Sequence, residues 1–100
     1  MTLVIPKEHV GSDIFKAPDE TVRATLLAAK EVAHLITEVF QKTVRVALVF
    51  EGLGVDHLHA KLYPLTADRH SEGFSTVDGP QASDGELAAT ARLLRKIPNA

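Results

Sequence analysis

The chain has no cysteine among its 100 residues. Disulfide bonds, thiolate zinc sites and cysteine nucleophiles are therefore excluded. It also has no excess of basic residues, because 11 lysines and arginines stand against 13 aspartates and glutamates, giving a net charge of −2. Proteins that bind a nucleic acid polymer release counterions through a basic surface, so we expect no such partner. A single nucleotide does not need such a surface and stays open as a ligand.

A long hydrophobic run is missing as well. The apolar stretch near the start is only Leu3-Val4-Ile5, followed by Pro6, which is too short for the hydrophobic region of a signal peptide or for a membrane span. We therefore expect a cytoplasmic protein without a membrane partner. The length, with 45% hydrophobic and 24% charged residues and no internal repeat, suits a single globular domain over residues 1–100.

What the sequence does contain is an alternating stretch, Asp-His-Leu-His-Ala-Lys-Leu-Tyr-Pro, from Asp56 to Pro64. The alternation predicts a strand that ends at the proline, with polar side chains on one face and aliphatic ones on the other. Side chains on one strand face lie about 6.5–7 Å apart, so His57, His59 and Lys61 could contact a single phosphate group. A solvated strand face without any chemistry gives the same pattern, and this interpretation stays open.

The first half of the chain predicts a short strand from Thr2 to Ile5 and a long helix from Pro18 to about Lys42. The helix has an apolar stripe at steps of three and four residues, and its polar side carries His34, which we expect to be solvated. The stripe consists of Val22, Leu26, Ala29, Ala33, Ile36 and Phe40. A second strand from Thr43 to Glu51 should pair antiparallel with the histidine strand through the connection Gly52–Asp56.

The last third predicts a loop from Thr66 to Ala82 and a terminal helix from Ser83 to Ile97. The helix should begin with a capping box, because Ser83 is followed three residues later by Glu86. His70 lies in the loop and is given no role. The fold expected is α+β, with an antiparallel sheet packed on one long helix and a short C-terminal helix.

Two motifs resemble those of the histidine triad (HIT) family. That family carries His-x-His-x-His followed by two apolar residues, and here His57 and His59 match the first two histidines while Lys61 stands in place of the third. Val-Ile-Pro-Lys-Glu-His, which ends at His9, is similar to the Ile-Pro-Lys-x-His segment before the long helix of the family. The resemblance covers Thr2 to Leu65. The N-terminal part of the family domain has no counterpart before Met1, so the chain is either a fragment of such a domain or, if complete, has a pocket that is open, rebuilt by a partner or absent.

The resemblance implies hydrolysis or transfer of nucleotides at the α-phosphate, with a nucleotide or dinucleoside polyphosphate as substrate. His59 matches the histidine that attacks phosphorus and becomes a nucleotidyl-histidine, and His57 would orient it. The positions that would contact the substrate are Lys61, His9, Gly52 and Gly54. No cofactor or metal is implied. Pairing as a homodimer through the long helix and a sheet edge is expected.

Lys61 departs from the family pattern in its chemistry. A charged lysine cannot accept a hydrogen bond or shuttle a proton near pH 7, which argues against hydrolysis. The uridylyltransferase branch of the superfamily carries glutamine there, so nucleotidyl transfer does not demand a third histidine. Leu53 and Gly54 occupy a turn where many members have a polar contact with the phosphate.

Two other functions are compatible with the same residues. The first is a catalytically silent module with the HIT fold that binds nucleotides or anions or serves dimerisation, which Lys61 and the short N-terminal part favour. The second is a zinc site made by His9, His57 and His59, since zinc accepts imidazole nitrogens. No carboxylate or cysteine clearly converges with these histidines, and the resemblance requires no metal.

Overall fold

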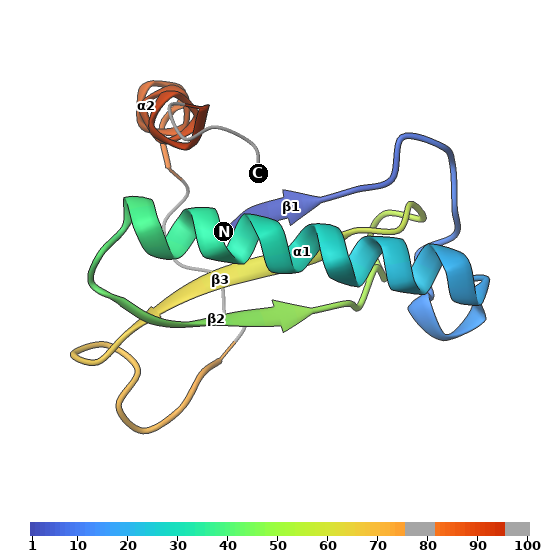
Figure 1. Ribbon diagram of the computed structural model, residues 1–100, viewed down its shortest axis with the longest axis horizontal. Coiled ribbons are helices and arrows are strands. Elements are labelled where there is room, and N and C mark those ends of the chain that lie inside the picture. The colour runs from blue at the N-terminus through green and yellow to red at the C-terminus, as the bar shows by residue number, and fades with distance from the viewer. Residues whose placement is uncertain (76–81, 96–100) are drawn as a thin grey trace.

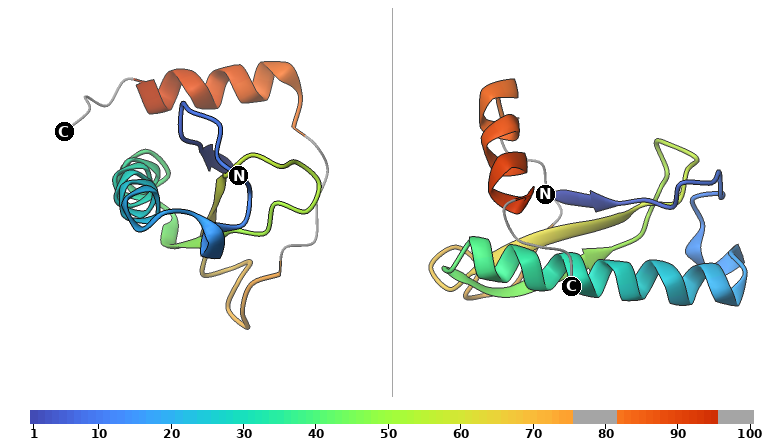
Figure 2. Two further views of the ribbon diagram at one scale, coloured as in Figure 1. Left: turned by 90° about the vertical axis from the view of Figure 1, so that its right-hand side faces the viewer. Right: turned by 45° about the horizontal axis from the view of Figure 1, so that its top comes forward.

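The computed structural model describes residues 1–75 and 82–95. A three-stranded antiparallel sheet, in the order β1-β3-β2, is covered on one face by a long helix, and a second helix lies beside it (Figures 1 and 2). The predicted α+β class is therefore confirmed. The elements in chain order are β1 (Thr2–Val4), the 3₁₀ turn η1 (Ile14–Lys16), α1 (Asp19–Val39), β2 (Thr43–Val49), β3 (Ala60–Thr66) and α2 (Asp84–Arg95).

The long helix α1 begins directly after Pro18, and the acidic residues of its first turn, Asp19 and Glu20, lie where the helix dipole favours negative charge. It ends at Val39, earlier than the predicted Lys42. The reason is the turn into β2, in which the N–H of Thr43 donates to the carbonyl of Phe40 at 2.9 Å. The sheet can then start one short turn after the helix.

The core lies between α1 and the sheet. Its hydrophobic side chains that are at most 2% exposed are Ala29, Ile36, Ala60 and Leu62. The predicted stripe is thus confirmed at Ala29 and Ile36, but Leu26 is 42% exposed whereas Thr25 is buried. Thr25 and Ala29 lie one helical turn apart on the side that faces the sheet. Their small side chains allow the helix to approach the sheet closely, and Leu26 is turned away from it.

The predicted strand from Asp56 to Pro64 is wrong at both ends, although its antiparallel pairing with β2 is confirmed. At its C-terminal end β3 continues through Pro64, which lies opposite Val46. Proline has no N–H to donate and is tolerated in a strand only where no neighbour needs that group. The register of β1 covers only Ala60 to Leu62, so beside Pro64 the β1 side of the strand is an edge.

At its N-terminal end β3 begins only at Ala60. The connection from β2 therefore spans residues 50–59, and is longer than the predicted Gly52–Asp56. Its second half is held by the segment that follows β1 instead of by a neighbouring strand. Both segments lie side by side at one end of the sheet (Figures 1 and 2).

The C-terminal part follows the prediction where the structure describes it. Residues 67–75 of the predicted loop contain neither helix nor strand, and its part from 76 to 81 lies outside the described residues. The capping box is confirmed, since the N–H of Glu86 donates to Ser83 Oγ at 3.1 Å and the N–H of Ser83 donates to Glu86 Oε1 at 3.4 Å. The predicted end at Ile97 also lies outside the described part.

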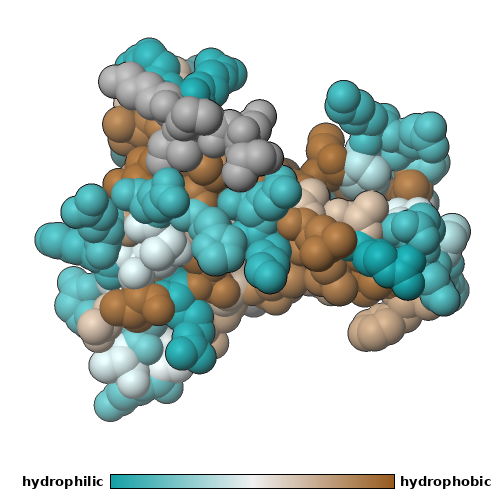
Figure 3. Space-filling model, viewed as in Figure 1, coloured by the Kyte–Doolittle hydropathy of each residue, from teal (hydrophilic) through white to brown (hydrophobic). Residues whose placement is uncertain are grey.

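Apolar surface is visible on the side of the molecule that carries the helices. Figure 3 shows hydrophobic side chains below α2 and along the middle of α1. None of the described residues of α2 is buried, and Leu94 is its member that packs against the core. Within residues 1–75 and 82–95, neither helix combines the length and the apolar character needed to cross a membrane.

Candidate functional site

The predicted row of polar side chains, formed by His57, His59 and Lys61, is present on the face of the sheet opposite α1. Along the chain, buried and half-buried residues alternate. The three aliphatic residues of the stretch, which are at most 2% exposed, are Leu58, Ala60 and Leu62. His57, His59 and Lys61 lie between them and are half-buried. The alternation therefore holds on both sides of the point where the hydrogen-bonded strand begins, and it brings both histidines and the lysine to one face.

Backbone carbonyls of the segment after β1 hold the histidine stretch in place. The N–H of Leu58 donates to the carbonyl of Val10 at 2.8 Å. His57 Nε2 donates to the carbonyl of Pro6 at 3.2 Å, because a carbonyl oxygen can only accept. The Val-Ile-Pro-Lys-Glu-His motif thus contacts His57 through the main chain of Pro6. Its own histidine, His9, is exposed and meets the ring of His57 edge-on, with centroids 5.5 Å apart.

The ring of His59 is fixed by the backbone next to it. Its Nδ1 lies 2.6 Å from the carbonyl oxygen of His57. Since the carbonyl oxygen only accepts, Nδ1 must carry the hydrogen. In the neutral imidazole the lone pair is then on Nε2, the nitrogen on the far side of the ring. His59 is therefore held in the tautomer and orientation of a nitrogen nucleophile or base.

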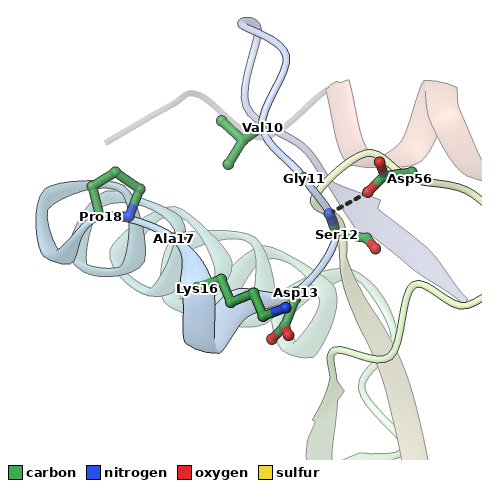
Figure 4. Close-up of a pocket in the computed structure, with 8 residues that line it drawn as sticks. All are labelled: Val10, Gly11, Ser12, Asp13, Lys16, Ala17, Pro18 and Asp56. Carbon is green, nitrogen blue, oxygen red and sulfur yellow. Dashed lines mark hydrogen bonds between the residues drawn. The ribbon is translucent and has the colours of Figure 1, made fainter.

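Ser12 joins the same support to the turn after β2. Its N–H donates to Asp56 Oδ1 at 2.9 Å, the bond drawn in Figure 4, and its hydroxyl donates to the carbonyl of Gly52 at 2.9 Å. The N–H of Ser12 keeps the pKa of Asp56 below its usual range. Gly52 has φ of +59°, and a Cβ built there would lie 2.3 Å from Ser12 Cβ. The glycine is thus required by the turn and by the close approach of Ser12.

Gly52 therefore has a structural role in the turn, and its predicted contact with the substrate stays a prediction. At Gly54, in contrast, an added Cβ would meet no atom within 4 Å. The turn is open at Gly54, so its backbone can be approached by a ligand from solvent.

A pocket of about 430 Å³ lies beside the histidine stretch, between residues 10–13, η1 and the start of α1 (Figure 4). Its charged lining groups are Asp13, Lys16 and Asp56. Two carboxylates and one ammonium would repel a phosphate more than they attract it. This pocket is therefore not a favourable site for a phosphate.

Glu51 is one of three residues of the site that the sequence pattern did not indicate. Its carboxylate forms an ion pair with Lys61 Nζ through Oε1 and accepts the N–H of Leu53 at 2.9 Å through Oε2. The Lys61 ammonium is the main reason that the pKa of Glu51 is lowered to about 2. The signal in the sequence was its place two residues beyond Val49, on the face that Lys61 shares. Ser12 and Asp56, also missed, had no comparable signal.

Acid should remove the contribution of this ion pair to stability over a defined pH range. The pKa of Glu51 falls from its ordinary value of 4.5 to about 2 on folding, so folding favours the ionised carboxylate. The contribution is complete above about pH 4.5 and is lost as the pH falls toward about 2. We expect the free energy of unfolding, measured with urea, to decrease through this range and to decrease less steeply in Glu51→Gln. Identical pH profiles would show that the pair does not contribute.

The three histidines do not converge as a metal site. Among the residues that the structure describes, no group of three or more histidine, aspartate or glutamate side chains is arranged to hold a metal ion. His70 lies away from the row, where its Nδ1 accepts the N–H of Thr66 at 3.0 Å. His34 is exposed on α1, as predicted.

Comparison of the chain with protein-family models gives no match, and comparison with curated protein sequences gives none either. The resemblance to the histidine triad family therefore rests on the two short motifs and remains a prediction. What the structure adds is that these two motifs, far apart in the sequence, lie against each other.

Proposed function

We propose that this chain has a histidine triad-like fold and acts on nucleotides at the α-phosphate, with His59 as the nucleophile. The observation that carries the proposal is the bond from His59 Nδ1 to the carbonyl of His57. It leaves the lone pair of the neutral ring on Nε2 and fixes the direction of that lone pair. Nucleophiles in covalent catalysis are commonly held in position by a hydrogen bond to a neighbouring group, and here that group is the carbonyl of His57.

The reaction proceeds in two displacements. The lone pair of His59 Nε2 attacks the α-phosphorus, a P–N bond forms, and the bond from phosphorus to the leaving group breaks with its electron pair on the leaving group, which takes a proton from solvent. In the second step water or another acceptor attacks phosphorus, the P–N bond breaks and the acceptor loses a proton. Lys61 and the N–H groups of the turn after β2 stabilise the negative charge on the phosphoryl oxygens.

The charge of Lys61 affects which acceptor can attack in the second step. As an ammonium near pH 7 it stabilises charge but does not move protons. Deprotonation of an attacking water therefore has no base at this position, whereas an acceptor that is already anionic needs none. Nucleotidyl transfer to an anionic acceptor is for this reason favoured over hydrolysis.

The proposal predicts a covalent nucleotidyl protein. Wild-type protein is mixed briefly with an adenylated amine or a dinucleoside polyphosphate, quenched without acid because P–N bonds are acid-labile, and measured by intact-protein mass spectrometry. We expect one added nucleoside monophosphate, which peptide mapping locates on His59. An adduct located on another residue, or no adduct with either class of nucleotide, would contradict the mechanism.

A second function is favoured by one observation, the ion pair that already engages Lys61 with Glu51. A module that binds nucleotides or anions without turnover would keep the histidine row and need no proton shuttle. For this second function we expect no added mass by mass spectrometry, together with saturable nucleotide binding in a separate calorimetric titration.

A further inference from the structure

The carboxylate of Glu51 is held in the way that a bound anion would be held. One oxygen contacts the ammonium of Lys61, and the other accepts the N–H of Leu53 at 2.9 Å. The N–H of Gly52 also favours the charged form of the carboxylate and lowers its pKa. An ammonium together with the N–H groups of a glycine turn is a set of donors that proteins use for phosphate. The turn is thus an anion site that is filled by a side chain of the protein itself.

This filled site lies at the same end of the sheet as the proposed nucleophile. Val49 pairs with Lys61 at the last position of the β2–β3 register. Glu51 follows Val49 by two residues, and His59 precedes Lys61 by two residues. The ion pair places Glu51 beside Lys61, and the alternation of buried and half-buried residues from His57 to Lys61 places His59 on the same face. A ligand with more than one phosphate group can then contact both the Lys61 site and His59.

The carboxylate can leave its site without unfolding of the chain. The side chains of Glu51 and Lys61 are 39% and 22% exposed. Ion pairs that water reaches contribute little net stability, because solvent screens them and replaces their hydrogen bonds. The turn is also open on the side of Gly54, where an added Cβ would meet no atom within 4 Å.

We propose that Glu51 is an internal competitor for the substrate phosphate: it occupies the Lys61 site in the free protein, and a phosphate must displace it to bind. This inference rests on the proposed function in assigning Lys61 to the substrate. Two anions cannot share the site, since like charges at contact distance repel. Displacing Glu51 subtracts the same amount from the binding free energy of every anion. Weakly bound anions are thereby excluded, and a ligand with further contacts to the histidines is retained.

The test compares the affinity for inorganic pyrophosphate of wild type and Glu51→Gln by isothermal titration calorimetry. Glutamine keeps the size of the side chain and an oxygen that accepts the N–H of Leu53, but it has no charge. We expect pyrophosphate and AMP to bind about tenfold more tightly to Glu51→Gln, each by a similar factor. The matched control is Glu38→Gln, which makes the same charge change at an exposed position of α1 and should leave the affinity within about twofold of wild type.

Two further measurements make the test independent of one variant. In a Lys61→Met background, Glu51→Gln should give no gain in affinity, because the two residues then have no site to compete for. In wild-type protein, titration with pyrophosphate should shift the carboxyl carbon resonance of Glu51 as the ion pair is released. An unshifted resonance during saturable binding overturns the proposal.

The inference is overturned if Glu51→Gln binds pyrophosphate equally or more weakly than wild type, since Glu51 then positions Lys61 and does not compete. Absence of pyrophosphate binding in both proteins overturns it as well. Formation of the His59 adduct is measured separately. An adduct combined with weaker binding by Glu51→Gln refutes only the competitor role, and tighter binding without any adduct refutes only the proposed chemistry.

Discussion

Replacement of His59 by alanine is expected to lower nucleotide turnover by on the order of a thousandfold or more, and to abolish the nucleotidyl adduct. The variant loses the only group that the mechanism uses to form a bond to phosphorus. The fold should persist, because His59 is half-buried and its hydrogen bond is to the adjacent carbonyl of His57. Turnover is measured with the nucleotide that gives the adduct in wild type, and the fold is checked by circular dichroism.

The chain offers one matched control for this variant and one variant with a smaller expected effect. His34→Ala removes an exposed imidazole from α1 and should leave turnover at the wild-type level. His9→Ala removes the ring that lies edge-on to His57 and should reduce turnover by about tenfold, because it supports the site without touching phosphorus. Wild-type turnover in His59→Ala would rule out the covalent mechanism.

Gly52→Ala is expected to lower the free energy of unfolding by about 2–5 kcal/mol. One part, about 1–2 kcal/mol, comes from holding a side chain in the left-handed region, since Gly52 has φ of +59°. The other part, about 1–3 kcal/mol, comes from overpacking, because the new Cβ would lie 2.3 Å from Ser12 Cβ and 3.3 Å from the Ser12 carbonyl oxygen. Urea unfolding monitored by circular dichroism measures the loss.

Gly54→Ala is the control, two residues further along the same turn. A Cβ there meets nothing within 4 Å, and φ is outside the left-handed region. We expect its free energy of unfolding to stay within about 0.5 kcal/mol of wild type. If both variants were equally stable, the close contact between Gly52 and Ser12 would not be a constraint on the fold. If Gly54→Ala kept its stability but bound nucleotide less well, the open side of the turn would be identified as the approach of the ligand.

Local patterns were sufficient to predict most of the elements. The period of the long helix, the capping box at Ser83 and the alternation through His57 to Tyr63 depend on neighbours in the sequence, and the structure has them. Boundaries depended on distant residues. β3 runs through Pro64 where β1 no longer pairs with it, and α1 turns Thr25 rather than Leu26 toward the sheet.

The candidate site was predicted only in its histidines and its lysine. The partner of Lys61 is Glu51, ten positions earlier, and the partners of Ser12 are 40 and 44 positions later. Contacts between residues that are so far apart in the chain do not produce a periodic pattern in the sequence. The tautomer of His59 could not be predicted either, because it is set by the direction of a single backbone carbonyl.

The contact between Ser12 and Gly52 also sets limits on how this protein can evolve. A Cβ at position 52 collides with the side chain of Ser12 first and with its backbone only at 3.3 Å. Substitution of Gly52 is therefore less harmful once position 12 has lost its side chain, while the strain of the left-handed backbone remains. The two positions are epistatic: in a set of functional variants, residues larger than glycine at position 52 should be found together with glycine at position 12.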